Sequence, residues 1–101
     1  MARKKRIARR VRRFVRQNSL LLTRFDNWYV GVTNCVERRQ RQHRNRLGKD
    51  LEIFEFWKAR SARDAADIER VFLEMGMDGS YGGWNQDSVY IYVFKYRGPY
   101  A

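Results

Sequence analysis

The stretch at residues 28–48 reads WYVGVTNCVERRQRQHRNRLG, and a change of pattern inside it decides the fold. Residues 28–33 are mostly aromatic and β-branched, which predicts a strand. Asn34 and Glu37 then stand three positions apart, the spacing of a helix-starting capping box. We therefore expect a helix over residues 35–46, and a strand followed at once by a helix indicates a layered architecture built from both elements.

Further along the chain the same alternation continues. Residues 51–58 are rich in Ile, Phe and Trp and predict a second strand, and residues 89–96 alternate in a way typical of a third. Between them, Ser61 is a helix-starting residue and Gly76 a helix-ending one, and together they bracket a helix at 62–75. We expect an α/β (α+β) fold with a small three-stranded mixed sheet flanked by helices.

Two connecting segments are less regular. Residues 18–27 predict a hinge whose leucines, Leu20 to Leu22, pack into the core. Residues 76–87 predict a glycine-rich connection that lacks the lysine of a phosphate-binding loop and any dinucleotide fingerprint. Its Tyr81 and Trp84 are of the type that stacks on unpaired bases.

Charge is distributed very unevenly along the 101 residues, whose formal net charge is +11. Residues 1–25 hold ten Lys and Arg and no acidic residue, whereas residues 26–101 hold twelve Lys and Arg against eleven Asp and Glu. An acid-free segment of this kind repels itself, so we expect a polyanion to neutralise it, and the phosphate backbone is the commonest one. The sequence thus predicts an arginine-rich N-terminal arm, 1–25, and a domain, 26–101.

The arm has helical periodicity over residues 3–17, because Ile7, Val11, Phe14 and Val15 recur on one side. This apolar stripe either docks on the domain, which leaves the basic faces for phosphates, or lies on a membrane surface. A targeting segment is a third interpretation. The side chains predicted to bind nucleic acid, with DNA favoured over RNA, are Arg3, Lys4, Lys5, Arg6, Arg9, Arg10, Arg12, Arg13 and Arg16, together with Arg38 and Arg41 of the next helix.

Cys35 is the single cysteine, so it cannot form an internal disulfide, and it has no partners at zinc spacing. A lone cysteine favours a reducing compartment. The chain has no apolar run of about eighteen residues, so no transmembrane segment is expected. We expect a cytoplasmic or nucleoid-associated protein, with a virion location as the alternative, and no feature of the sequence identifies a protein partner.

Glu69 interrupts the pattern of the helix at 62–75. Ala65, Ile68 and Phe72 define the apolar side of this helix, and Glu69 falls inside the same arc. A carboxylate that faces the core must be paired, protonated or bound to a metal, because an unpaired buried charge is too costly. An ordinary buried ion pair, or a side chain that reaches out to solvent, is the alternative interpretation.

The helix at 35–46 offers a cation to the same core. Arg39 and His43 stand one turn apart at the edge of its inward side, which Val36 and Leu47 define. His43 by itself is more typical of a structural histidine, because the chain has no second histidine to share a metal. Arg39 is therefore the candidate partner of a buried carboxylate.

These residues resemble the second half of the motif that defines the GIY-YIG nuclease superfamily. The tripeptide at 29–31 is similar to its second tripeptide, and Arg39 and His43 follow the glycine by eight and twelve positions. Ala66 and Glu69 resemble the later helix of that family, which carries its metal-binding glutamate.

The resemblance covers roughly residues 28–75, and it implies metal-dependent cleavage of a DNA phosphodiester by a small domain of phage or bacterial character. It implies that Tyr29 lies beside the scissile phosphate and positions or deprotonates the attacking water. Arg39 would stabilise charge on the phosphoryl oxygens, and Glu69 would hold one divalent cation, with Mg²⁺ expected. His43 matches a position near the active centre where the family often has histidine or tyrosine.

The first half of the family motif, a Gly-Ile-Tyr strand shortly before the second tyrosine, is missing, because residues 18–21 read Asn-Ser-Leu-Leu. We hypothesise that the domain is circularly permuted, so that a strand at 88–94 lies beside residues 28–33. Tyr90 or Tyr92 would then reach the site, and Tyr90 is the candidate catalytic residue. The alternative is that both tyrosines pack on the helices, as aromatic residues of a sheet commonly do.

The sequence therefore leaves two functions open. The first is a GIY-YIG-like endonuclease that uses Mg²⁺. The second function is that of a protein with the same fold and no catalytic activity, which binds DNA or RNA as a structural component of a virion or a ribosome-associated particle.

Overall fold

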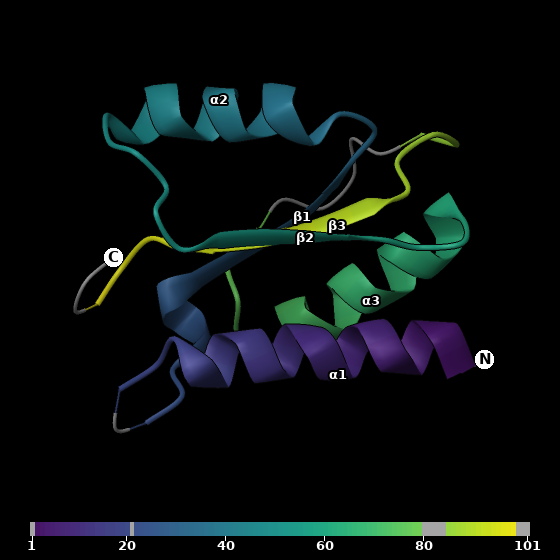
Figure 1. The fold of residues 1–101 in the computed structure, drawn as a ribbon, viewed down its shortest axis with the longest axis horizontal. Helices are drawn as coiled ribbons and strands as arrows, with labels where there is room; N and C mark the ends of the chain where they lie inside the picture. The colour runs from purple at the N-terminus through teal and green to yellow at the C-terminus, as the bar shows by residue number, and fades with distance from the viewer. Residues whose placement is uncertain (1, 21, 80–84, 99–101) are drawn as a thin grey trace.

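The computed structural model describes residues 2–20, 22–79 and 85–98. In chain order the elements are α1 (Ala2–Gln17), the 3-10 helix η1 (Phe25–Asn27), β1 (Trp28–Thr33), α2 (Val36–Leu47), β2 (Phe54–Lys58), α3 (Ala62–Glu74) and β3 (Tyr90–Lys95) (Figure 1). The expected alternation of strands and helices is confirmed. Tyr81 and Trp84, with Gly82 and Gly83 of the predicted glycine-rich connection, lie outside the described residues.

The last strand, β3, lies in the middle of the sheet, in the order β1-β3-β2. It pairs antiparallel with both neighbours. Val93 lies opposite Val30 of β1 and opposite Glu55 of β2. The predicted α+β architecture is confirmed, but the strands form an antiparallel sheet rather than a mixed one. β1 and β2 do run in the same direction, as a strand-helix-strand unit predicts, yet β3 inserts between them. The one parallel pairing in the described part of the chain is an isolated bridge between Tyr29 and Asp78.

Different helices cover the two faces of the sheet. α2 lies on one face, and α1 and α3 lie on the other (Figure 1). Because successive side chains of a strand point to opposite faces, Trp28 and Val30 join the hydrophobic cluster under α1 and α3. Tyr29, Tyr92 and Phe94 form a smaller aromatic cluster on the other face. The α2 face is therefore the one whose core contains hydroxyl groups.

α1 belongs to the main hydrophobic core. Ile7 is 5% exposed and Val11 and Val15 are 0% exposed, in the same cluster as Ile68 and Phe72 of α3. The apolar stripe of the predicted arm therefore docks on the rest of the chain, which is the first of the arrangements that the sequence left open. The stripe is not available to a membrane surface, and none of the helices in the described ranges is long and apolar enough to cross a membrane.

Two local expectations are wrong. The residue that caps the start of α2 is Cys35, without a side-chain hydrogen bond, whereas the Oδ1 atom of Asn34 accepts a hydrogen bond from Arg38. Leu20 and Leu22 are 62% and 76% exposed instead of packing into the core. The stripe of α1 already fills that face of the sheet, so the connection after it has no apolar space to enter.

Candidate active site

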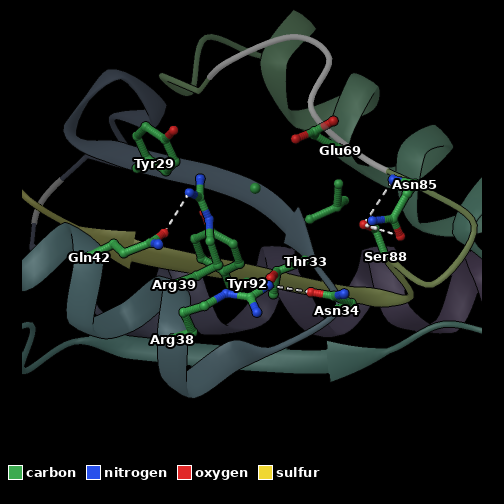
Figure 2. A pocket seen from close by; sticks show the side chains of 12 residues that line it. Tyr29, Thr33, Asn34, Arg38, Arg39, Gln42, Glu69, Asn85, Ser88 and Tyr92 are labelled. Atoms are coloured by element: carbon green, nitrogen blue, oxygen red, sulfur yellow. Dashed lines mark hydrogen bonds between the residues drawn. The ribbon is translucent and has the colours of Figure 1, made fainter.

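A pocket of about 360 Å³ opens at the outer edge of β1. Because β1 is an edge strand, side chains from helices on opposite faces of the sheet can meet there. Figure 2 shows Glu69 on one side of β1 and Arg39 and Tyr92 on the other. The lining residues that the sequence singled out are Tyr29, Gly31, Arg38, Arg39, Glu69 and Tyr92. The structure thus brings together residues from β1, α2, α3 and β3.

Glu69 on α3 is only 7% exposed, and burial raises the pKa of its carboxyl to about 7. Within residues 2–20, 22–79 and 85–98, no side chain forms an ion pair with it. The ion pair with Arg39 that the sequence allowed is absent there, since that guanidinium bonds to Gln42 and Tyr92 instead. Glu69 is therefore a carboxylate that lines a pocket without a counter-charge.

Glu69 is the acidic residue among those that line the pocket, so a divalent cation bound there would have one carboxylate ligand from the described chain. Mg²⁺ is commonly bound through one or two carboxylates and keeps several waters. The described part of the chain contains no group of three or more potential metal ligands, so Glu69 would be the single charged protein ligand. Water and substrate oxygens would complete the coordination.

The hydroxyl of Tyr92 is the centre of a hydrogen-bond network. The Nε2 atom of His43 lies 2.8 Å from it, and Nη2 of Arg39 donates to it at 3.4 Å. On the other ring nitrogen, Nη2 of Arg46 lies 2.8 Å from Nδ1 of His43. A guanidinium can only donate, so Nδ1 accepts, and neutral His43 carries its proton on Nε2 and donates it to Tyr92. The phenol oxygen then accepts two hydrogen bonds, and its own O–H can donate to a group bound in the pocket.

The pKa shifts in this network favour uncharged groups. Burial, followed by the positive charges of Arg46 and Arg39, lowers the pKa of His43 to about 4. Burial raises the pKa of Tyr92 to about 12, although the charge of Arg39 opposes this shift. Near neutral pH both rings are therefore uncharged, and the permanent charge beside them comes from the arginines.

Tyr29 is fixed between the pocket and α2 by packing. Its ring, 7% exposed, stacks on Phe94 with centroids 5.1 Å apart and meets His43 in an edge contact at 4.7 Å. The guanidinium carbon of Arg46 lies 5.7 Å from the same ring centroid, within the range of a cation–π contact. Tyr29 is thus placed at the pocket by an aromatic cluster.

Gly31 allows Tyr92 to lie across β1. A Cβ atom at residue 31 would be 2.8 Å from Cε2 of Tyr92 and closer still to the end of the ring. The backbone of Gly31 is not in the left-handed region, so it is the close approach of the neighbouring strand that requires glycine here.

The position of β3 bears on the hypothesis of a circular permutation. β3 lies directly beside β1, as the permutation hypothesis requires, and Gly31 pairs with Tyr92. Tyr92 lines the pocket, whereas Tyr90 contacts Phe56, with ring centroids 6.1 Å apart, and Lys58, whose Nζ lies 6.0 Å from its ring centroid. Two residues along a strand shift a side chain by about 7 Å on the same face. Tyr92 therefore replaces Tyr90 as the candidate tyrosine of the site.

Five polar lining residues were not predicted as site residues: Thr33, Asn34, Gln42, Asn85 and Ser88. The Oε1 atom of Gln42 accepts a hydrogen bond of 2.9 Å from Arg39 and so orients its guanidinium. Asn85 and Ser88 close the turn before β3, where the backbone N–H of Asn85 donates to Ser88 Oγ at 3.1 Å. Only Gln42 had a usable signal, because residues three apart on a helix are neighbours.

The basic side chains predicted to bind nucleic acid fall into two sets. Arg38 lines the pocket, and Arg41 is exposed on α2 outside it. The basic residues of α1 lie across the sheet from α2 (Figure 1), and Lys4 among them pairs with Asp67 at 3.0 Å. The others on α1 are exposed, namely Arg3, Lys5, Arg6, Arg9, Arg10, Arg12, Arg13 and Arg16.

Comparisons of the chain with protein-family models, with curated proteins and with solved structures give no match. The resemblance to GIY-YIG nucleases therefore depends on the sequence pattern of Tyr29, Arg39, His43 and Glu69. Three of these residues line the pocket, and His43 does not.

Proposed function

We propose that this protein binds nucleic acid, with DNA favoured, and cleaves a phosphodiester bond in the pocket at the edge of β1, as GIY-YIG endonucleases do. The observation that carries the proposal is the convergence of Tyr29, Arg39, Glu69 and Tyr92 on one open pocket. Packing alone gives no reason for a buried carboxylate without an ion-pair partner among the described residues to line the same pocket as an arginine and two tyrosines.

Glu69 would hold the divalent cation, for which Mg²⁺ is expected. When bound, the cation would supply positive charge to the phosphate oxygens and make a bound water more acidic. The raised pKa of Glu69 is compatible with this role, since a nearby opposite charge favours the ionised form of a carboxyl.

Arg39 would bind the phosphoryl oxygens. A guanidinium has five N–H donors, and the contacts with Gln42 and Tyr92 use two of its terminal nitrogens for one bond each. Further N–H groups remain for a phosphate, and these two contacts hold the guanidinium in place before the substrate arrives. Such pre-oriented donors stabilise the charge that develops in the transition state.

Tyr92 would take the place of the missing first tyrosine. Its oxygen accepts hydrogen bonds from His43 and from Arg39, which fix its position. Because its pKa of about 12 keeps Tyr92 protonated near neutral pH, Tyr92 would pass its proton to a phosphate oxygen as it accepts the proton of the attacking water, which Tyr29 positions. His43 acts through Tyr92 as a positioning residue.

A second candidate function is a nucleic-acid-binding protein with the same pocket and no cleavage. The observation that favours it is the single carboxylate, with a pKa of about 7, in a described chain that has no three-ligand metal group. The pocket would then bind a phosphate through Arg39 and Arg38 without a metal.

A nicking assay on supercoiled plasmid separates the two functions. We expect the wild type to nick DNA with Mg²⁺ and not with chelator, and Glu69→Gln and Arg39→Gln to lose at least about 100-fold in rate, as the loss of one transition-state donor does. Arg44→Gln, an exposed arginine of the same helix outside the pocket, is the matched control and should nick at nearly the wild-type rate.

Equal nicking by the wild type and Glu69→Gln would contradict the catalytic proposal. If no variant nicks with any divalent cation, and DNA binding in chelator is the same with and without Glu69→Gln, the second function holds.

A further inference from the structure

A second groove, of about 450 Å³, lies between α1 and the edge strand β2. Its basic side chains are Arg3, Arg6 and Arg10 of α1, Lys58 of β2 and Arg60, and no acidic residue lines it. None of these residues belongs to the pocket at β1.

The wall of this groove is packed against the hydrophobic core. Trp57 of β2 lines it and contacts Phe14 of α1 edge to face, with ring centroids 6.0 Å apart. Phe14 in turn contacts Trp28 at 5.7 Å, and Trp28 is 0% exposed. Ile7, 5% exposed, also lines the groove. The basic side chains of the groove therefore extend from elements that pack in the hydrophobic core.

The positive charge of the groove is not balanced within the described chain. Lys4, which is on the α3 side of α1, pairs with Asp67, but no acidic side chain in the described ranges pairs with Arg3, Arg6 or Arg10. Clustered cations of one sign raise the local potential and attract a polyanion.

The spacing of the arginines on α1 fits one strand of a nucleic acid. Arg3, Arg6 and Arg10 follow one another at intervals of three and four residues and so lie along one side of the helix. They span about 10 Å along the helix axis, at 1.5 Å per residue. Phosphates of one strand recur about every 3.4 Å along a duplex axis, so this row of cations can reach about three of them.

The groove and the pocket open at the same end of the sheet. Lys58 pairs with Tyr90, and Tyr90 pairs with Thr33. Thr33 lines the pocket and Lys58 lines the groove. Two strand spacings separate their backbones, which is about 10 Å. The two openings are therefore close enough for one nucleic acid to contact both.

We propose that the groove between α1 and β2 binds the phosphate backbone of the DNA segment adjacent to the one in the pocket, without reading its bases. This inference rests on the nucleic-acid-binding part of the proposed function and not on cleavage. A lipid surface does not fit, because the apolar side of α1 is buried in the core and an interfacial helix must place that side in the membrane.

The test compares two triple variants of the full chain, each made together with Glu69→Gln and measured in chelator so that no cleavage occurs. The groove variant is Arg3→Gln, Arg6→Gln and Arg10→Gln. The matched variant is Lys5→Gln, Arg9→Gln and Arg12→Gln, which removes the same charge from the same turns of α1 on the side away from β2. Glutamine retains helix propensity in both.

The measurement is the affinity for a short labelled DNA duplex by fluorescence anisotropy, at salt concentrations from about 50 to 200 mM. Each lost phosphate contact reduces the slope of log affinity against log salt by about 0.9. We expect the groove variant to lose a slope of about 2 to 3 and the matched variant to lose less than about 1. Arg60→Gln, on the opposite wall, should lose about 1.

Equal loss of slope in the two triple variants would overturn the inference, because binding would then depend on the total charge of α1. An unchanged slope in Arg60→Gln would also overturn it, since the side of the groove opposite α1 would then not contact the DNA. If the wild type does not nick DNA, only the cleavage proposal is contradicted. The inference about the groove would still hold if the groove variant reduces the slope of log affinity against log salt more than the matched variant does.

Discussion

The Nε2 atom of His43 lies 2.8 Å from the phenol oxygen of Tyr92, although 49 positions separate the two residues. His43 is 2% exposed and Tyr92 is 0% exposed. The donor from Arg46 on the far side of the imidazole leaves His43 to donate to Tyr92. This pair connects α2 to the central strand and orients the tyrosine that the pocket would use for proton transfer.

Tyr92→Phe is expected to lower the nicking rate by at least about 100-fold, the usual contribution of a positioned acid or base. Tyr90→Phe removes the same atom two residues away on the same strand and should leave the rate close to that of the wild type. Initial rates of plasmid nicking measure both. A larger loss in Tyr90→Phe than in Tyr92→Phe would restore Tyr90 as the catalytic tyrosine.

Glu69→Gln is expected to raise the melting temperature at about pH 8 and to leave it nearly unchanged at about pH 5. The pKa of Glu69 is higher in the folded chain, about 7, than its ordinary value of 4.5. The folded state therefore binds this proton more tightly, and stability falls as the pH rises between these two values. Glutamine has no proton to lose.

Thermal unfolding at the two pH values, with and without Mg²⁺, makes the measurement. Mg²⁺ should stabilise the wild type at about pH 8 and not Glu69→Gln, because a ligand of the folded state raises its stability. If the melting temperature of Glu69→Gln differs from that of the wild type by the same amount at both pH values, the pKa of Glu69 is not raised in the folded chain.

His43 is expected to make the fold less stable as the pH falls from about 6.5 to about 4. The pKa of His43 is lowered from 6.5 to about 4 in the folded chain, so the unfolded state binds more protons in this window. Because Glu69 has the opposite slope over part of the same range, the comparison is made in the Glu69→Gln background. Chemical unfolding against pH should be flatter after His43→Gln, and an equally steep curve would contradict the assignment.

Gly31→Ala is expected to cost about 1–3 kcal/mol of stability, the usual penalty for overpacking, and to abolish nicking. The added methyl group would collide with the Tyr92 ring and displace its hydroxyl from His43. Denaturant unfolding and nicking rates measure the two effects. Val32→Ala, at the next position on β1 and half-buried, is the control, and it should keep Tyr92 in place. Full activity of Gly31→Ala would show that the position of Tyr92 is not needed.

Val11→Ala is expected to destabilise the whole chain by about 2 kcal/mol, because two buried methyl groups are lost and a cavity remains. Arg12→Ala, exposed on the next residue, should change stability by less than about 0.5 kcal/mol. Urea unfolding measures both. Removal of residues 1–17 should unfold the chain for the same reason, so point variants are the better probes of DNA binding. A stable chain after that deletion would show α1 to be a separate arm.

The sequence indicated the local parts of this structure well. Strand and helix positions depend on the spacing of apolar residues among near neighbours, which is why β1, α2 and α3 lie close to where they were expected. The same periodicity placed Glu69 inside the apolar arc of α3 and Arg39 on the inward side of α2. The expected cap of α2 is wrong, because the side chain of Asn34 accepts a hydrogen bond from Arg38 and not from the backbone at the helix start.

By itself, then, the sequence determined the elements, the uneven charge and the buried carboxylate of Glu69, since each of these is encoded in neighbouring residues. Only the tertiary structure decided that β3 lies between β1 and β2, and that Tyr92 rather than Tyr90 lines the pocket with Glu69 and Arg39. It also placed α1 against β2, which creates the basic groove. These arrangements depend on pairing between segments far apart in the chain, where a shift of two residues along one strand changes which side chain reaches the site.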